Sequence, residues 1–386
     1  MTEKLYYIDS HMSVFTAAVL SCQETKKGYA VVLDKTAFFP EGGGQSADTG
    51  YIGDVRVLDA QEQGDEVLHY VDGPLEVGAE YPCRIDWEQR LRRMQSHSGE
   101  HIVSGVTHNL FGYDNVGFHM GEGGIMTIDF NGELTEEQLM LIEKTANEAV
   151  RANLPIRCTF PEPEVLRQLD YRSKLELTGN VRIVEIEGVD RCACCAPHVS
   201  LTGEIGLIKL IEHTRHRGGV RVTLVCGMDA LDYVNQIQSS AFAVSRLLSA
   251  KRHEIGPAVE RILAEQLKNK ERIGALSMEL AREKAGKLAP CEGNICVFDN
   301  VLDEVALREL VNLLVEKCGG FAAAFSGDDE AGYRYIIGSR HVDLRAASKK
   351  INAAINGRGG GSVEMIQGRA SAGAADIERA VTEIEL

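Results

Sequence analysis

Two pairs of side chains in this sequence have the types and the spacing of metal ligands. His97 and His101 lie four residues apart in a stretch predicted to be helical, so both imidazoles lie on one face and can bind the same ion. Cys194 and His198 have the same separation, but Pro197 disfavours a helical turn there and places the pair on a loop or tight turn. Together the pairs offer three nitrogens and one sulfur, a set of donors typical of zinc.

Each pair alone is a weak signal. With 11 histidines in 386 residues, about 0.3 His-x3-His pairs arise by chance, and histidines on a helix surface or in a core are the alternative. Cys192 and Cys195 could compete with Cys194. Four protein ligands also make a closed, structural type of site, whereas catalytic zinc usually keeps an open position. The sequence therefore leaves open whether the ion activates water or positions the substrate.

Length and composition limit the classes of protein to which the chain can belong. A chain of 386 residues is long enough for two or three domains, each with its own core. No apolar run approaches the roughly 20 residues of a membrane span, and the N-terminus lacks a signal-peptide pattern, so the expected location is the cytoplasm, with no membrane partner. Ten scattered cysteines do not suggest a disulfide scaffold. The net charge of −16 argues against nonspecific nucleic-acid binding but not against a local basic patch.

A small β-barrel is expected over residues 1–88, directly before the segment that carries the first ligand pair. Short β-rich runs alternate there with turn residues, and a glycine-rich loop interrupts them. A mobile hairpin turn is the alternative for this loop. The expected strands are Val14–Ser21, Tyr29–Leu33, Val55–Leu58, Val67–Val71 and Tyr81–Ile85.

A mixed α+β domain is expected over residues 89–228, which would hold the zinc site. Apolar periodicity predicts a helix over Trp87–Leu110 that carries His97 and His101. Thr135 and Gln138 predict a capping box at the start of a second helix that ends near Asn153. The remaining expectations are a loop at Gly117–Gly121, strands at Ile125–Phe130 and Val181–Ile186, and a hairpin of Ile205–Glu212 with Val220–Cys226.

Residues 229–287 predict a helical hairpin, with Gly256-Pro257 separating two helices that each carry an apolar stripe. A pair of packed helices is the simplest interpretation, as a structural arm or an element that forms a homodimer. An α/β C-terminal domain is expected over residues 288–386, and it too could form the homodimer. The overall fold class is therefore α+β.

Two further segments carry a resemblance to a known family. Ala37–Gly50 resembles the glycine-rich segment of the editing domain of alanyl-tRNA synthetases. Cys194 to His198, followed by Val199 and Thr202–Gly206, is similar to the cysteine-to-histidine motif of that domain. The chain therefore resembles the long members of the AlaX family, the freestanding relatives of this editing domain.

The resemblance implies a trans-editing hydrolase, an aminoacyl-tRNA deacylase. Its implied substrate is Ser-tRNA(Ala), with Gly-tRNA(Ala) as a second candidate, and its implied cofactor is Zn²⁺ held by His97, His101, Cys194 and His198. The resemblance also implies catalytic roles for Gln45, His97 and His101. Substrate binding is assigned to the loop residues Glu41, Gly42, Gly43, Gly44, Gln45 and Ser46. Cys195-Ala196-Pro197 departs from the Gly-Gly-Thr of the synthetases, which puts a local backbone contact to the substrate in doubt.

The C-terminal domain resembles that of alanyl-tRNA synthetases through Arg358–Ser362 and Met365–Ala370, and it would engage tRNA. Solvated surface charge is the alternative for every basic residue proposed here. The tRNA-binding candidates are Arg215, Arg217 and Arg221, then Lys349, Lys350, Arg358 and Arg369, with a further cluster at Arg90, Arg92 and Arg93. Two other functions stay open: a non-catalytic, zinc-stabilised tRNA-binding protein, and a different esterase on the same scaffold.

Overall fold

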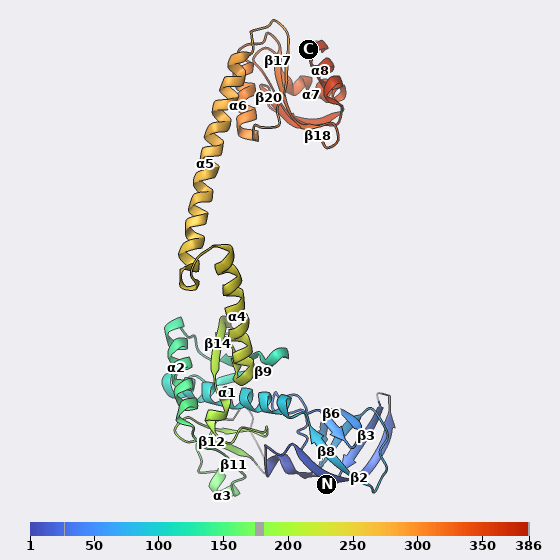
Figure 1. The fold of residues 1–386 in the computed structure, drawn as a ribbon, viewed down its shortest axis with the longest axis vertical. Helices are drawn as coiled ribbons and strands as arrows, with labels where there is room; N and C mark the ends of the chain where they lie inside the picture. The colour runs from blue at the N-terminus through green and yellow to red at the C-terminus, as the bar shows by residue number, and fades with distance from the viewer. Residues whose placement is uncertain (27, 174–180, 385–386) are drawn as a thin grey trace. The chain divides into compact units, whose positions relative to one another are not determined.

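The computed structural model describes residues 1–26, 28–173 and 181–384, and these residues contain eight α-helices and several sheets (Figure 1). This confirms the mixed α+β class. The chain divides into two compact units, Met1–Phe242 and Ala243–Leu386, and each is described here by itself.

A closed barrel of six strands, in the order β2-β3-β7-β6-β5-β8, begins the first unit. All its pairings are antiparallel, and alternate residues such as Phe15, Val31 and Val57 fill its interior. A separate parallel pair joins β1 (Glu3–Lys4), which precedes the barrel strands in sequence, to β4 (Lys35–Thr36), which lies between β3 and β5. The barrel strands are β2 (Val14–Thr25), β3 (Gly28–Leu33), β5 (Gly50–Ile52), β6 (Val55–Gln63), β7 (Glu66–Val71) and β8 (Glu80–Ile85).

Helix α1 (Trp87–Phe111) follows the barrel and carries the first ligand pair. The helix ends at Gly112, whose left-handed backbone favours glycine. Its apolar residues, Ile102 and Val106 among them, belong to a core shared with the neighbouring sheet and helix. Gly105 permits an unusually close approach, because a Cβ atom there would lie 2.3 Å from the carbonyl oxygen of Val189.

Two small sheets and helix α2 (Glu136–Ala152) complete this unit around α1. The capping box of Thr135 and Gln138 is confirmed, with both reciprocal hydrogen bonds present. The loop expected at Gly117–Gly121 is wrong, because most of it pairs as a strand with β10. The four-stranded sheet has the order β14 (Ile208–His216), β15 (Gly219–Cys226), β10 (Met126–Phe130), β9 (Asn115–Met120). The three-stranded sheet has the order β11 (Ile156–Thr159), β12 (Ile183–Ile186), β13 (Asp190–Ala193), and the short helix α3 (Pro163–Leu166) follows β11 in the chain.

Helices α4 (Gly227–Leu247) and α5 (Ile255–Lys287) are separate, as expected, but the break falls at 248–254. Gly256 and Pro257 instead lie in the first turn of α5, where proline is tolerated because its missing N–H has no helical acceptor. Much of the apolar stripe on each helix is exposed. Among the described residues, no helix is long and apolar enough to cross a membrane.

The second unit is built on a five-stranded sheet, β16-β17-β18-β20-β19. Successive residues of β17 alternate between two cores: Ala322 packs with α6, and Phe321 packs with α7 and α8 (Figure 1). The bounds are β16 (Ile295–Phe298), α6 (Glu304–Leu314), β17 (Phe321–Asp328), β18 (Gly332–Ser339), α7 (Leu344–Ala354), β19 (Gly357–Gly361), β20 (Met365–Ala370) and α8 (Ala374–Glu383).

Candidate metal centre

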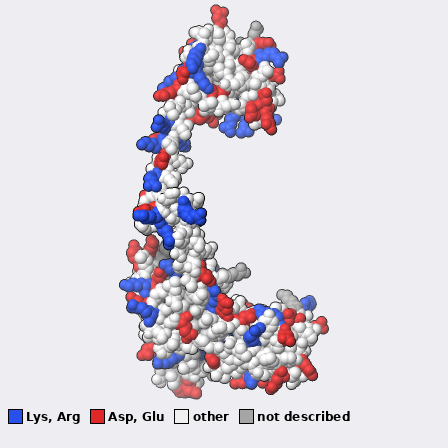
Figure 2. Space-filling model, viewed as in Figure 1, with Lys and Arg blue, Asp and Glu red and all other residues white. Residues whose placement is uncertain are grey.

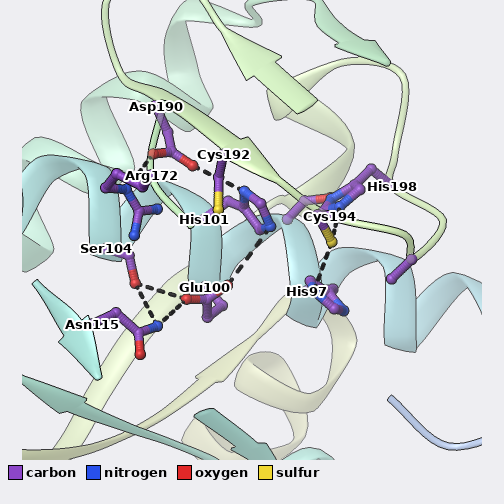
Figure 3. Close-up of polar contacts among 12 residues, drawn as sticks. His97, Glu100, His101, Ser104, Asn115, Arg172, Asp190, Cys192, Cys194 and His198 are labelled. Carbon is purple, nitrogen blue, oxygen red and sulfur yellow. Dashed lines mark hydrogen bonds and ion pairs between the residues drawn. The ribbon is translucent and has the colours of Figure 1, made fainter. Parts of the chain in front are cut away.

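The structure brings the two predicted ligand pairs together in the first unit. His97 and His101 project from α1, while Cys194 and His198 lie on the loop after β13 (Figure 3). Their donor atoms all lie within 4.8 Å of one another. The Cys194 Sγ atom is 3.4 Å from Nε2 of His97 and 3.4 Å from Nε2 of His198.

These distances suit a tetrahedral zinc ion. With Zn–N near 2.05 Å and Zn–S near 2.3 Å, a tetrahedral angle places sulfur and nitrogen about 3.6 Å apart. The observed 3.4 Å separations need only a small adjustment. The chemistry of the donor set, three imidazoles and one thiolate, therefore fits the ion that the motif predicts.

Every histidine of the cluster is oriented by a partner on its other ring nitrogen. Nδ1 of His101 donates to Oδ2 of Asp190 at 2.9 Å, and Nδ1 of His97 donates to Oε1 of Gln45 at 3.2 Å. Nδ1 of His198 lies 3.0 Å from the hydroxyl of Ser98. With all three Nδ1 atoms engaged, all three Nε2 atoms are free to face the sulfur, which is how metal-binding histidines are normally held.

The electrostatics favour the metal-binding protonation states of Cys194 and His198, but not that of His101. Burial would raise the pKa of Cys194, but His97, His101 and His198 lower it well below its ordinary value. Burial lowers the pKa of His198 to about 3. Burial alone would lower the pKa of His101, but its bond to Asp190 raises it well above the usual value. A bound metal would displace the proton from His101.

The competing cysteines differ from Cys194 in both place and charge. Burial raises the pKa of Cys195 to about 11 and also raises the pKa of Cys192, so both are held as thiols. Cys192 groups instead with His101 and Asp190. The geometry and the pKa values thus favour Cys194 over its two neighbours as the sulfur ligand.

The glycine-rich loop lies against this cluster. A Cβ atom on Gly43 would lie 3.3 Å from Sγ of Cys195 and 4.0 Å from the ring of His97, and the backbone of Gly43 is left-handed. Backbone hydrogen bonds between Gly42 and Gln45, 3.0 Å in both directions, close the turn. Of the other predicted loop residues, Gly44 lines the cleft, Glu41 accepts from Gln61, and Ser46 is exposed.

A buried ion pair anchors the loop to α1. Arg90, with no exposed surface, binds the carboxylate of Asp48 and donates to the carbonyl oxygens of Ser10 and Ala37. Asp48 in turn accepts from the backbone N–H of Phe39 at 2.7 Å. Arg90 was a tRNA-binding candidate, but this network shows that it supports the fold of the site instead.

Gln45 is buried and contacts a ligand. Its Oε1 holds His97, whereas its Nε2 has no hydrogen-bond partner among the described residues. Buried amide groups usually have partners. The free N–H donor is therefore available to a bound molecule.

A cleft opens over the cluster. His97, His101 and Cys194 line it, together with Gly43, Glu100 and Tyr7, whereas His198 lies outside the lining. Arg182 supports this wall, because its guanidinium donates to the carbonyl oxygens of Cys194 and Ala196. An ion held by the four ligands would thus be approached from the side of the cleft.

The other tRNA-binding candidates of the first unit are not among the residues that line this cleft. Arg215 pairs with Glu133 at 2.5 Å, and Arg221 is held by both oxygens of Asp129. Arg217 is exposed at the turn between β14 and β15, with Arg217 and Gly218 both left-handed as a tight hairpin requires. Arg92 binds Asp229 and Asp232, and Arg93 donates to the carbonyl oxygen of Ala47.

In the second unit, Lys349, Lys350, Arg358 and Arg369 are exposed. Arg358 and Arg369 are direct partners in the register of β19 and β20. On the faces visible in Figure 2, basic and acidic side chains are interspersed over both units.

Of the three residues that orient the ligands, Gln45 was predicted as a site residue, whereas Asp190 and Ser98 were missed. Asp190 lies four residues before Cys194, and Ser98 lies next to His97, so both were close to the motifs. The available signal was a hydrogen-bonding side chain near each ligand, since metal-bound histidines need such partners. Which histidine each one serves depends on tertiary contacts.

Comparison with known proteins supports the resemblance drawn from the motifs. Residues 181–222 match the family described as the threonyl and alanyl tRNA synthetase second additional domain, and residues 3–89 match class II (A) tRNA synthetases. The chain is 27% identical to the alanyl-tRNA editing protein Aarsd1 of Mus musculus over 387 residues, covering 94% of this chain and 93% of that protein.

Two further proteins are similar to this chain at slightly higher identity. Alanyl-tRNA editing protein Aarsd1-A of Xenopus laevis is 32% identical over 245 residues, 62% of this chain and 59% of that protein. An alanine–tRNA ligase of Pyrobaculum neutrophilum is 31% identical over 400 residues, 95% of this chain but only 42% of the ligase.

Proposed function

The chain belongs to the AlaX-type proteins, relatives of the editing domain of alanyl-tRNA synthetases, and from this membership and the cluster's geometry we propose that it is a zinc-dependent aminoacyl-tRNA deacylase. Its proposed substrate is tRNA(Ala) mischarged with serine, and glycine is a second candidate. The observation that carries the proposal is the set of three oriented histidines around Cys194 beneath an open cleft.

Zn²⁺ bound by His97, His101, Cys194 and His198 would supply Lewis-acid chemistry to an ester held in the cleft. The protein's own contribution is to position the ester. The backbone of the glycine-rich loop, lacking side chains at Gly43 and Gly44, leaves room for a ligand beside His97 and Phe118. Asp190, Gln45 and Ser98 hold the ligands in place.

Selectivity against alanine requires more than space. Seryl and alanyl esters differ by one oxygen, so a pocket that merely fits size cannot spare the smaller group. A site with a polar partner for the serine hydroxyl discriminates by roughly 10⁴ to 10⁵ at best, because alanine leaves that partner unpaired. We assign this role to the unpartnered Nε2 of Gln45.

Binding of the tRNA body is assigned to the exposed basic residues. Arg358 and Arg369 face each other across β19 and β20, and like charges directly opposite are unfavourable unless an anion lies between them or nearby. Lys349 and Arg217 are also exposed. Arg215 and Arg221 would have to bind phosphates in addition to their acidic partners, Glu133 and Asp129.

The proposal is tested by hydrolysis of seryl-tRNA(Ala) and alanyl-tRNA(Ala) by the wild-type protein, with and without a chelator. We expect rapid hydrolysis of the seryl ester alone, and its loss on removal of the metal. Gln45→Ala should reduce kcat/KM for the seryl ester. Equal hydrolysis of both esters by the wild-type protein would refute the selectivity.

The second candidate is a tRNA-binding protein with a structural metal. It is favoured by one observation, the four protein ligands, because structural zinc sites are closed by four ligands. This candidate predicts tRNA binding without hydrolysis of either ester. The same assay therefore separates the two functions.

A further inference from the structure

Glu100 is a buried acidic residue at the cleft that the proposed chemistry has not used. Its side chain is held rigidly, because Oε1 accepts from Nδ2 of Asn115 at 2.5 Å and from the hydroxyl of Ser104 at 2.7 Å (Figure 3). Asn115 also donates to Ser104 at 3.0 Å. The two donors thus fix one carboxylate oxygen and leave the other in a defined position.

The second oxygen lacks a partner of its own. Within the described residues, no donor lies at hydrogen-bond distance from Oε2, and the nearest cationic group is Nε2 of His101 at 3.8 Å. That nitrogen belongs to the metal cluster, and Glu100 lies outside the four-residue group. Glu100 is only 4% exposed, and a buried carboxylate is costly unless a cation balances it.

Three other acids of the cleft lining already have partners among the basic side chains. Asp190 binds both His101 and Arg172, Asp114 pairs with His108, and Glu185 pairs with Arg191. Asp170 also lines the cleft but is exposed. Glu100 is therefore the buried acid of the lining that still has an oxygen to offer a cationic ligand.

We propose that Glu100 binds the α-ammonium group of the aminoacyl ester, a role that rests on the proposed function. In any aminoacyl ester the α-nitrogen lies roughly 2.5 Å from the carbonyl carbon. An ester whose carbonyl group lies at the cluster thus carries a positive charge within reach of Oε2, which lies 3.8 Å from His101 Nε2. The carboxylate would orient the ester and favour substrates with a free amine.

The test compares esters that differ only at the amine. Seryl-tRNA(Ala) and its N-acetylated form are hydrolysed by the full-length wild-type protein and by Glu100→Gln, which keeps an oxygen acceptor for Asn115 and Ser104. We expect the variant to lose roughly 10- to 100-fold in kcat/KM on the free amine, the value of a hydrogen bond to a charged group. The rate on the N-acetylated ester should change little.

A matched control removes a different cleft carboxylate. Asp114 also lines the cleft, but its side chain is half exposed and is paired with His108. Asp114→Asn should therefore retain the preference for the free amine. Asn115→Ala provides a second variant, because it releases Oε1 of Glu100 and should weaken the same preference without removing the carboxylate.

A binding measurement separates this inference from the proposed function. The non-hydrolysable amide 3′-serylamino-3′-deoxyadenosine and its N-acetylated form are titrated into the zinc-loaded protein by calorimetry. Glu100→Gln should weaken binding of the free amine alone, with unchanged zinc content. If both ligands weaken equally, or if both esters slow equally, Glu100 acts on water or on His101 and the inference is overturned. Failure of the wild-type protein to hydrolyse seryl-tRNA(Ala) would refute the proposed function instead.

Discussion

Asp190→Asn is the substitution that best isolates the orientation of a ligand from the ligand itself. Oδ2 of Asp190 accepts from Nδ1 of His101 at 2.9 Å, and Oδ1 accepts from Nε of Arg172 at 2.8 Å. An asparagine of the same size can keep only one of these acceptors and replaces the other with a donor. His101 would then lose its fixed orientation or Arg172 would lose its partner.

The expected magnitude follows from the role of such partners. Loss of a residue that orients a metal ligand typically weakens metal affinity 10- to 100-fold. This corresponds to roughly 1.4 to 2.7 kcal/mol, since each factor of ten is worth about 1.4 kcal/mol. The side chain of Asp190 is only 1% exposed, so solvent cannot replace it.

The assay is competition for Zn²⁺ between the protein and a chromophoric chelator at fixed pH. Asp129→Asn is the matched control, because it breaks a comparable acid–arginine pair, 2.6 Å from Arg221, outside the cluster. Unfolding of the metal-free proteins by urea should be measured in parallel. Zinc affinity equal to wild type in a folded Asp190→Asn protein would refute the role of Asp190.

Three further predictions concern the scaffold. Gly105→Ala should lower the free energy of unfolding by about 1 to 3 kcal/mol through overpacking and should weaken zinc binding, because its Cβ would lie 2.7 Å from Cβ of Asp190. The control Gly274→Ala, in open space on α5, should not destabilise the protein. Burial lowers the pKa of His69 to about 4, below the roughly 6.5 of an unfolded chain. The free energy of unfolding should therefore be greatest above pH 6.5 and fall by about 3 kcal/mol towards pH 4, because the unfolded chain binds this proton more readily. Urea unfolding of His69→Gln should show a flatter pH profile over this window. A protein ending at Phe242 should keep single-turnover hydrolysis but bind tRNA more weakly, and a folded but inactive fragment would contradict this.

Local signals in the sequence predicted local structure. The capping box at Thr135 and the start of α1 at Trp87 depend on neighbouring residues, and both are confirmed. The break between α4 and α5 was misplaced because a proline in a first turn does not end a helix. Strand β9 was missed because Gly117 and Gly121 suggest a loop, while pairing with β10 decides the structure.

The sequence predicted the ligand pairs of the candidate site and, through the family resemblance, a glycine-rich loop with Gln45 beside them. The spacings of His97 with His101 and of Cys194 with His198 are visible in the sequence, and the structure brings the four donor atoms together. The contacts of Gln45, Ser98 and Asp190 with the rings join residues up to 100 positions apart, so spacing could not assign them. The buried pair of Arg90 with Asp48 was hidden for the same reason.

In the proposed function, hydrolysis of seryl-tRNA(Ala) depends on one metal ion held by the four-residue cluster. The most direct measurement removes the metal with a chelator and titrates Zn²⁺ back while single-turnover hydrolysis is followed. We predict that the metal-free protein is inactive, that the rate rises linearly to one equivalent of zinc per chain, and that Cys194→Ala shows no such recovery. Full hydrolysis by the metal-free protein would contradict it.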